Sequence, residues 1–314
     1  MSINHDKKHD LEKQGYRIVG SHSAVKTCLW TKKSIVCPTE CYKGSFYGIR
    51  SWRCVQMSPS LFSCTHRCVW CWRDIAFTRP EWVGRVDEPK QIVDGCIREH
   101  IKLLMGYWGN SKADRTRLYE AKRPLHFAIS LISEPCFYPR LPELINEIHN
   151  RGMTTFLVTN ATLPEMLERL IKNPPTQLYI TLPAPNEQLY RQVCNPLIKD
   201  GWSRIMRSLE LLGQFSCRRT IRMTLVKGKN MLRPEEYAEL LSMIKADFIE
   251  LKAYMFVGYS QQRLSIGNMP EHEEILGFAE QIASHSQLKI IDQRPESRVV
   301  LMMKRDSPDR VMRF

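Results

Sequence analysis

From about residue 56 onward, the pattern of apolar and polar positions changes repeatedly between that of a buried strand and that of an amphipathic helix. Short runs rich in apolar and β-branched residues predict strands over 56–62, 126–132, 154–160, 177–184, 219–226 and 248–256. A last strand-like run follows at 298–304. Because each short run is separated from the next by a longer segment, we expect parallel strands joined by crossover connections.

The longer segments place their apolar residues at the spacing of one helix face. They predict helices over 88–109, 141–152, 162–173, 202–215, 233–246 and 270–285. This alternation predicts an α/β fold, as either a doubly wound sheet or an incomplete barrel. In both architectures the chemistry lies at the carboxyl ends of the parallel strands.

Residues 1–55 differ from the rest of the chain. They carry ten Lys and Arg against four Asp and Glu, a net charge of +6, and their hydrophobic periodicity is weak. They also contain Cys28, Cys37, Cys41 and Cys54. We therefore expect short helices and loops that are ordered by a metal. The predicted organisation is a basic cysteine-bearing segment over 1–55, a barrel over 56–306 and a tail over 307–314.

Composition narrows the class of protein. The 314 residues contain no apolar run near the roughly 20 residues that span a bilayer, and the N-terminus has no apolar signal region. We expect a cytoplasmic monomer without membrane contact, in which the eleven cysteines serve as metal ligands or core residues and not in disulfides. The net charge of +13 favours a polyanionic partner, most plausibly a nucleic acid.

Cys64, Cys68 and Cys71 form the pattern C-x3-C-x2-C directly after the first predicted barrel strand. Thiolates are soft ligands for zinc or for iron–sulfur clusters. A structural zinc site would need a fourth ligand, for which His66 is the nearest candidate. A 4Fe-4S cluster with three cysteine ligands would instead keep one iron open for a substrate or cofactor. The spacing alone does not distinguish a zinc site from an iron–sulfur cluster.

With Trp70 before the last cysteine, the motif reads C-x3-C-x-aromatic-C and resembles the signature of radical S-adenosylmethionine (SAM) enzymes. This resemblance implies a partial (β/α)6 barrel, a 4Fe-4S cluster held by Cys64, Cys68 and Cys71, and SAM bound at the open iron. It also implies an external low-potential electron donor of the ferredoxin or flavodoxin type.

Blocks along the chain, from about residue 20 to 300, are similar to one radical SAM family, the tRNA 4-demethylwyosine synthases in their single-domain archaeal form. The blocks include "AVKTCLW", "CYKGSFYGI", "CTHRCVWCWRD", "AISLISEPCFYP" and "FIELKAYMFVGYSQQRL". The resemblance implies a lyase of the wyosine pathway. Its substrates would be pyruvate and tRNA-Phe that carries N1-methylguanosine beside the anticodon. A radical formed from SAM would take hydrogen from the methyl group, and the resulting carbon radical would add to pyruvate.

The same resemblance assigns the N-terminal cysteines. Cys28, Cys41 and Cys54 would hold a second 4Fe-4S cluster, whose open iron would bind pyruvate and polarise its ketone. Lys43 would form a Schiff base with that ketone, although most lysines are simply solvated surface charges. Cys37 competes for a ligand role but lies outside the matching blocks. The remaining cysteines are expected to pack as small apolar residues: Cys96, Cys136, Cys194 and Cys217.

The ends of two predicted strands carry the residues that the resemblance assigns to SAM. Ser133, Glu134 and Pro135 stand where the family usually has Gly-Glu-Pro, and Thr159 with Asn160 would contact the ribose. Ala161 replaces a common Gly, and Pro183 replaces a common Asp. Losing a glycine restricts the backbone, so these departures also allow a diverged radical SAM enzyme with another substrate.

The RNA surface is the least specific prediction. Candidate phosphate contacts lie in the N-terminal segment and at Arg115, Arg117, Lys122 and Arg123. Candidate stacking residues are Tyr16, Trp30, Trp52 and Tyr107, unless they pack in the core. A zinc-bearing RNA-binding protein without catalysis stays open as a further alternative.

Overall fold

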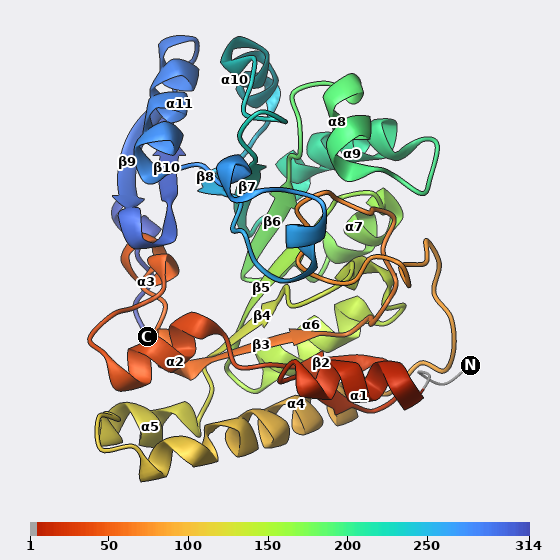
Figure 1. Ribbon diagram of the computed structural model, residues 1–314, viewed down its shortest axis with the longest axis vertical. Helices are drawn as coiled ribbons and strands as arrows, with labels where there is room; N and C mark the ends of the chain where they lie inside the picture. Colours follow the sequence, from red (N-terminus) through yellow and green to blue (C-terminus); the bar gives the residue numbers. More distant parts are fainter. Residues whose placement is uncertain (1–4) are drawn as a thin grey trace.

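A computed structural model describes residues 5–314 and contains one ten-stranded sheet, in the order β1-β2-β3-β4-β5-β6-β7-β8-β10-β9 (Figure 1). Residues 1–4 of the expected N-terminal segment lie outside the described part. The strands are β1 (Arg17–Val19), β2 (Ser23–Val25), β3 (Cys54–Ser58), β4 (His126–Ile129), β5 (Thr154–Thr159), β6 (Gln177–Thr181), β7 (Arg218–Leu225), β8 (Phe248–Ala253), β9 (Lys289–Arg294) and β10 (Val299–Met303).

The strands β3 to β8 pair in parallel and in chain order, so the six predicted strands of the barrel are confirmed. A doubly wound sheet would reverse its order at a switch point, whereas a barrel keeps chain order. The strands β3 and β8 do not pair with each other in the described sheet. The sheet is therefore an incomplete barrel, open between these two strands.

Helices follow the strands along the chain. They are α1 (His5–Lys13), α2 (Leu29–Val36), α3 (Tyr42–Tyr47), α4 (Pro89–Leu104), α5 (Arg115–Ala121), α6 (Leu141–Asn150), α7 (Pro164–Leu170), α8 (Glu187–Cys194), α9 (Gly201–Leu211), α10 (Pro234–Met243) and α11 (His272–Ser284). The sequence predicted most of these helices, but α5 and α8 were not anticipated, and neither were the strands β1, β2 and β9. None of the helices among residues 5–314 has the length and apolar character required to cross a bilayer.

Side chains alternate between two cores along the parallel strands. On β6, Leu178 and Ile180 belong to the large core beneath helices such as α6 and α7, while Tyr179 belongs to a smaller core with Tyr42 and Phe46 of α3. Successive strand residues point to opposite faces. Helix α3 therefore covers the inner face of the barrel, and the larger helices cover the outer face.

The N-terminal segment is more regular than expected. It forms α1, α2, α3 and the hairpin of β1 with β2, and β2 extends the sheet by antiparallel pairing with β3. The C-terminal tail returns to this segment, because the Met312 amide donates to the Tyr47 carbonyl at 3.0 Å and Arg50 Nη2 donates to the Phe314 carbonyl at 2.6 Å. Figure 1 shows the chain end beside α2 and α3. The division into segments at residues 55 and 306 stays a prediction.

Candidate active site

The loop after β3 carries Cys64, Cys68 and Cys71 and brings their thiols around the side chain of Arg73. Arg73 Nε donates to Cys71 Sγ at 3.3 Å. Burial disfavours the charge of Arg73, but the nearby charges of the three thiolates raise its pKa above the ordinary value. The cysteine loop therefore lies at the carboxyl end of a parallel strand, as the sequence predicted.

The thiols of Cys64, Cys68 and Cys71 do not form a group in which all three sulfur atoms lie within 4.8 Å of one another. Sulfur ligands at about 2.3 Å from zinc must lie close to one another. Among the described residues, one group of three metal-ligating atoms lies within 4.8 Å, and it is formed by His66, Cys68 and Cys194. Cys64 and Cys71 are not in it. The thiols of Cys64, Cys68 and Cys71 thus suit a polynuclear cluster better than a mononuclear site that uses His66.

Cys194 was expected only to pack in the core. It is buried, but its thiol also interacts with that of Cys68, which together with burial raises the pKa of Cys68 well above the ordinary value. His66 lies on the same side, with Nε2 at 2.9 Å from the Tyr190 hydroxyl. No sequence pattern indicates this contact, because Cys194 is 126 residues further along the chain than Cys68.

The ends of β4 and β5 are joined through the buried carboxylate of Glu134. Its Oε1 accepts a hydrogen bond from Thr159 Oγ1 at 2.7 Å, and its Oε2 accepts one from the backbone N–H of Asn160 at 2.7 Å. Burial raises the pKa of Glu134, and these hydrogen bonds oppose the shift. Three of the predicted SAM residues are thus brought together. The carboxylate is occupied by the protein's own donors, and its contact with SAM stays a prediction.

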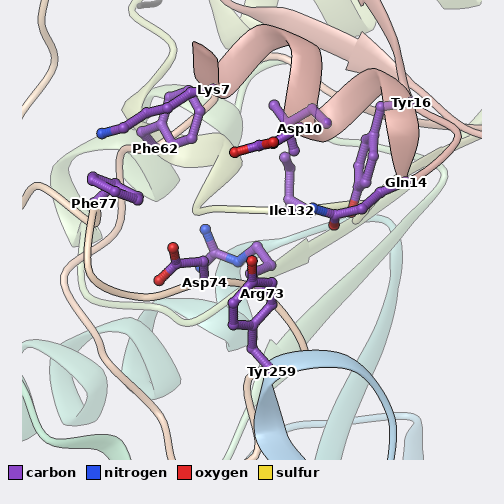
Figure 2. A pocket seen from close by; sticks show the side chains of 11 residues that line it. Lys7, Asp10, Gln14, Tyr16, Phe62, Arg73, Asp74, Phe77, Ile132 and Tyr259 are labelled. Atoms are coloured by element: carbon purple, nitrogen blue, oxygen red, sulfur yellow. The ribbon is translucent and has the colours of Figure 1, made fainter.

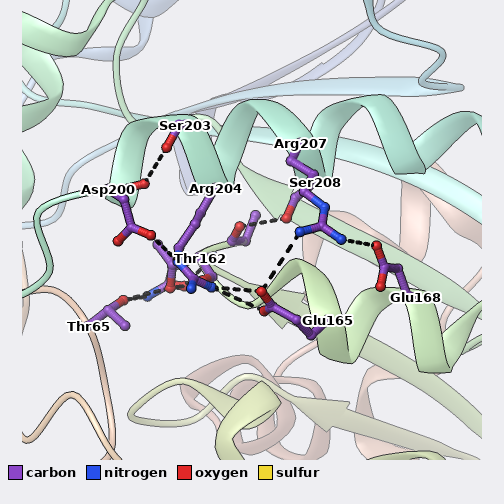
Figure 3. A network of polar contacts seen from close by, with 11 residues as sticks. Thr65, Thr162, Glu165, Glu168, Asp200, Ser203, Arg204, Arg207 and Ser208 are labelled. Carbon is purple, nitrogen blue, oxygen red and sulfur yellow. Dashed lines mark hydrogen bonds and ion pairs between the residues drawn. The ribbon is translucent and has the colours of Figure 1, made fainter.

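The β5 end also supports the cysteine loop. Asn160 Nδ2 donates to Thr65 Oγ1 at 3.0 Å and lies 3.6 Å from Cys64 Sγ. The hydroxyls of Thr65 and Thr162 are 2.7 Å apart (Figure 3). Further out, the same figure shows α9 tied to α7, where Arg204 pairs with Glu165 at 3.1 Å. The loop that carries the cysteines is therefore fixed against a rigid strand–helix unit.

Ser133 holds the turn after β4 by its side chain. Its Oγ accepts from the Phe62 amide and from Arg73 Nη1, both at 2.9 Å. Trp70 and Ser133 line a cavity of about 360 Å³, a size within the range of about 300–1,000 Å³ that is usual for small-ligand pockets. Pro135 is buried at the start of a short helix, Pro135–Phe137, and does not line this cavity.

Arg73 also borders a second, smaller cavity. This cavity, of about 50 Å³, lies beneath α1. Figure 2 shows Tyr16, Asp10 and Gln14 on one side of it and Arg73 with Tyr259 on the other. Tyr16 is 1% exposed and stacks near Trp72 at 6.1 Å, so it belongs to the core and is not available to stack on an RNA base. For Tyr16 the structure therefore favours the alternative interpretation, packing in the core.

Cys28, Cys41 and Cys54 come from three different elements and lie together. Cys28 precedes α2, Cys41 precedes α3 and Cys54 begins β3. Burial raises the pKa of Cys41 to about 11 and that of Cys54 to about 12, and the charge of Cys28 adds to both shifts. Cys37 is exposed. The grouping of three half-buried thiols fits a thiolate-bound cluster and leaves Cys37 outside it.

Lys43 lies beside these thiols. Its Nζ is 4.3 Å from the ring centroid of Tyr179 and 5.0 Å from that of Phe156. Its charge counteracts the raised pKa of Cys41 and Cys54. Lys43 is therefore an inward-facing, half-buried amine and not a solvated surface charge.

The structure adds a charged group that was not assigned from the sequence. Arg222 on β7 and Lys252 on β8 line the 360 Å³ cavity together with Cys68 and Cys71. Glu250 is fully buried and accepts from the Tyr42 and Tyr47 hydroxyls at 3.0 and 2.8 Å. The sequence could have indicated these residues, because they are charged and stand inside the apolar runs "RTIRMTLV" and "FIELKAYMF". Buried charges are rare without a partner or a function.

Several candidate RNA contacts are used within the protein. Arg117 stacks on Trp52 at 4.4 Å and pairs with Glu40 at 3.3 Å. Arg115, Lys122 and Arg123 are exposed on or beside α5. Trp30 and Tyr107 are half-buried. Within this group, the exposed basic residues on or beside α5 therefore stay predicted phosphate contacts.

Comparison with known proteins identifies close relatives. The profile of the radical SAM superfamily matches residues 59–241, and a profile described as wyosine base formation matches residues 244–304. The chain is 50% identical over 300 residues to the S-adenosyl-L-methionine-dependent tRNA 4-demethylwyosine synthase of Pyrococcus abyssi (strain GE5 / Orsay). That alignment covers 94% of this chain and 88% of the relative.

Solved structures give the same result. A structure of TYW1 with a lysine–pyruvate adduct bound is 36% identical and superposes with a TM-score of 0.89. A crystal structure of archaeal TYW1 is 34% identical with a TM-score of 0.80. Each comparison covers 99% of this chain and 100% of the solved one. The similarity therefore includes the N-terminal cysteine segment as well as the barrel.

Proposed function

This chain belongs to the tRNA 4-demethylwyosine synthase family of radical SAM enzymes, and we propose that it converts N1-methylguanosine beside the anticodon of tRNA-Phe into 4-demethylwyosine. Pyruvate supplies two carbons, which are joined to the methyl carbon and close a third ring. The first carbon of pyruvate is released. This assignment agrees with the lysine–pyruvate adduct in a structure that is 36% identical to this chain.

Cys64, Cys68 and Cys71 would hold the 4Fe-4S cluster common to radical SAM enzymes. When bound, that cluster supplies the electron that cleaves SAM, and an external donor of the ferredoxin or flavodoxin type restores it. The chain's own residues do the rest at this end of the barrel. Arg73 balances the thiolate charge, Trp70 and Ser133 shape the cavity for SAM, and the Glu134 carboxylate keeps Thr159 and Asn160 in place beside it.

Cys28, Cys41 and Cys54 would hold a second 4Fe-4S cluster, which would supply a Lewis acid for pyruvate. Lys43 would condense with the ketone, because its amine lies beside these thiols and faces the barrel interior. Condensation forms a carbon–nitrogen double bond and releases water. The aromatic rings of Tyr179 and Phe156 exclude solvent around the amine and lie at the distance of cation–π contacts.

One observation carries the proposal. Cys68 and Cys71 line the same cavity as Lys252, whose charge interacts with those of Cys41 and Cys28. Lys252 therefore links the cavity at the first cysteine set to the second set, so that a radical formed at one could meet pyruvate held at the other. The basic surface, with its net charge of +13, suits a tRNA substrate.

The test is anaerobic incubation of the reconstituted protein with methylated tRNA, SAM, pyruvate and a reductant, followed by mass analysis of the nucleosides. Carbon-13 at the second and third positions of pyruvate should enter the nucleoside, whereas carbon-13 at the first position should not. Omission of pyruvate is the control. Cleavage of SAM without any tricyclic nucleoside would instead indicate a diverged enzyme with another substrate.

A further inference from the structure

Two cationic side chains stand on neighbouring strands and face the barrel interior. Strands β7 and β8 pair Arg222 with Glu250 and Thr224 with Lys252, so Arg222 and Lys252 are diagonal neighbours on one face. Both line the cavity of about 360 Å³. Among the described residues, no carboxylate side chain lines it, and the further cation on its wall, Arg73, is balanced by the nearby thiols. The cavity therefore favours a negatively charged ligand.

The two cations differ in how they are neutralised. Arg222 pairs with Glu250 at 3.1 Å and also donates to the Tyr42 hydroxyl. Lys252 donates to the Ser297 carbonyl at 2.6 Å, but no acid in the described part of the chain lies within ion-pair distance of its Nζ. Burial, together with the charge of Arg222, lowers the pKa of Lys252 to about 8. The charges of Cys41, Glu250 and Cys28 oppose this shift. A half-buried ammonium without a counter-ion is costly unless a ligand supplies one.

The surroundings of this pair indicate which anion it takes. The Tyr179 ring lies 4.3 Å from Lys43 Nζ and 5.5 Å from the Arg222 guanidinium. The ring of Tyr42, the residue before Lys43, lies 5.2 Å from Lys252 Nζ. The Arg222 guanidinium thus shares the Tyr179 ring with the amine proposed to react with a ketone, and it shares the Tyr42 ring with Lys252. In pyruvate the carboxylate is directly bonded to the ketone carbon.

We propose that Arg222 and Lys252 form a carboxylate subsite that holds the carboxylate of pyruvate and orients its ketone toward Lys43. Lys252 makes the direct charged contact, and Arg222, held by Glu250 and Tyr42, fixes the direction of approach. The subsite rests on the proposed function but is separable from it. It concerns the binding of pyruvate and not the formation of a covalent adduct.

The experiment is calorimetric titration of the reconstituted protein with pyruvate and, separately, with pyruvamide, which has the same shape but no charge. The wild-type protein should bind pyruvate more tightly. Lys252→Gln, which keeps a donor for the Ser297 carbonyl, should weaken pyruvate binding about tenfold or more and leave pyruvamide unchanged. Lys252→Arg should recover part of the affinity. The exposed Lys289→Gln is the matched control and should bind both ligands like the wild type.

Three outcomes would overturn the subsite. The first is equal affinity of the wild-type protein for pyruvate and pyruvamide. The second is a Lys252→Gln variant that loses affinity for SAM, titrated in parallel, and keeps it for pyruvate. The third is a variant that loses iron but binds pyruvate normally, which would make Lys252 a counter-ion of the thiolates. If Lys252→Gln does not fold, Lys252→Met is titrated in its place.

The subsite and the proposed function can fail separately. Should borohydride trap no pyruvate on Lys43 while the charge-dependent binding of pyruvate persists, the Schiff base is wrong and the subsite stands. Should pyruvate be trapped on Lys43 with equal efficiency in wild type and Lys252→Gln at limiting pyruvate, the subsite is wrong and the Schiff base stands.

Discussion

Ser133 and Ala161, which follow adjacent parallel strands, adopt the same left-handed backbone conformation, each with a φ of +62°. The loss of a glycine at these positions was expected to restrict the backbone. The structure keeps the glycine-like conformation at both. Ser133 is held by two hydrogen bonds to its hydroxyl, and Ala161 by the bond from Ser208 Oγ to its carbonyl at 2.7 Å.

This conformation predicts an unusual response to glycine at Ala161. A left-handed non-glycine residue costs about 1–2 kcal/mol, which exceeds the entropic cost of glycine of about 0.5–1 kcal/mol. Ala161→Gly should therefore raise the free energy of unfolding by up to about 1 kcal/mol. Ala161→Val should lower it, because a β-branched side chain fits this region poorly. Urea unfolding measures both, and a loss of stability in Ala161→Gly would contradict the strain.

The two cysteine sets should be separable by mutation. Cys68→Ala and Cys54→Ala should each reduce the iron content from about eight to about four atoms per chain, because each removes a ligand of one cluster only. Cys68→Ala should lose SAM cleavage. Cys54→Ala should keep it and lose the tricyclic nucleoside. Exposed Cys37→Ala is the control and should retain all iron. Full iron content in either variant would contradict the assignment of the substituted cysteine as a cluster ligand.

Lys43 should be the residue that borohydride links to pyruvate. Reduction of the imine adds hydride to carbon and fixes the adduct, so peptide mapping locates it. Lys43→Arg keeps the charge but cannot form the imine, and it should show no adduct. Lys252 is the natural competitor, since burial lowers its pKa to about 8 and leaves more of the neutral amine. An adduct on the Lys252 peptide would move the Schiff base to that residue.

The sequence predicted the parts of this site that are local. The six strands follow from hydrophobic period, and Cys64, Cys68 and Cys71 lie within one loop, so neither required knowledge of packing. Arg222 and Lys252 were not assigned, because the sequence does not show which face of each strand points into the barrel. The N-terminal segment was expected to form short helices and loops, but the bounds of its helices and the hairpin of β1 with β2 were not predicted, since its many charges obscure the apolar period. Contacts such as Cys68 with Cys194 join distant segments and exist only in the fold.

His100 predicts the pH dependence of stability. It is fully buried on α4, neither ring nitrogen has a partner among the described residues, and burial lowers its pKa from 6.5 to about 4. The folded state holds the ring neutral, whereas the unfolded state can protonate it. The contribution of His100 to the free energy of unfolding is therefore fully present above pH 6.5 and is lost as the pH falls toward 4. Between pH 7 and 5 it should fall by about 2 kcal/mol.

The control separates His100 from other titrating groups. His100→Leu should make the urea-unfolding profile less steep between pH 7 and 5, whereas the exposed His285→Leu should leave it unchanged. The slope does not vanish entirely in His100→Leu, because burial also lowers the pKa of His126, to about 3. An identical slope in His100→Leu and the wild type would show that His100 does not titrate on unfolding.

Binding of tRNA should weaken steeply with salt. The chain carries a net charge of +13, and contacts with phosphates release counter-ions, so about four such contacts to a single strand would lower the affinity roughly fiftyfold between 50 and 200 mM salt. Arg115, Lys122 and Arg123 are exposed on or beside α5 and should supply part of this slope. The double variant Lys122→Gln with Arg123→Gln should reduce the slope of log affinity against log salt by more than the value of one phosphate contact. Lys289→Gln should not change this slope. Filter binding of methylated tRNA across this salt range measures the slope. An unchanged slope in the double variant would place the RNA on another face, and a flat salt dependence in the wild type would reduce the positive charge to a feature of solubility.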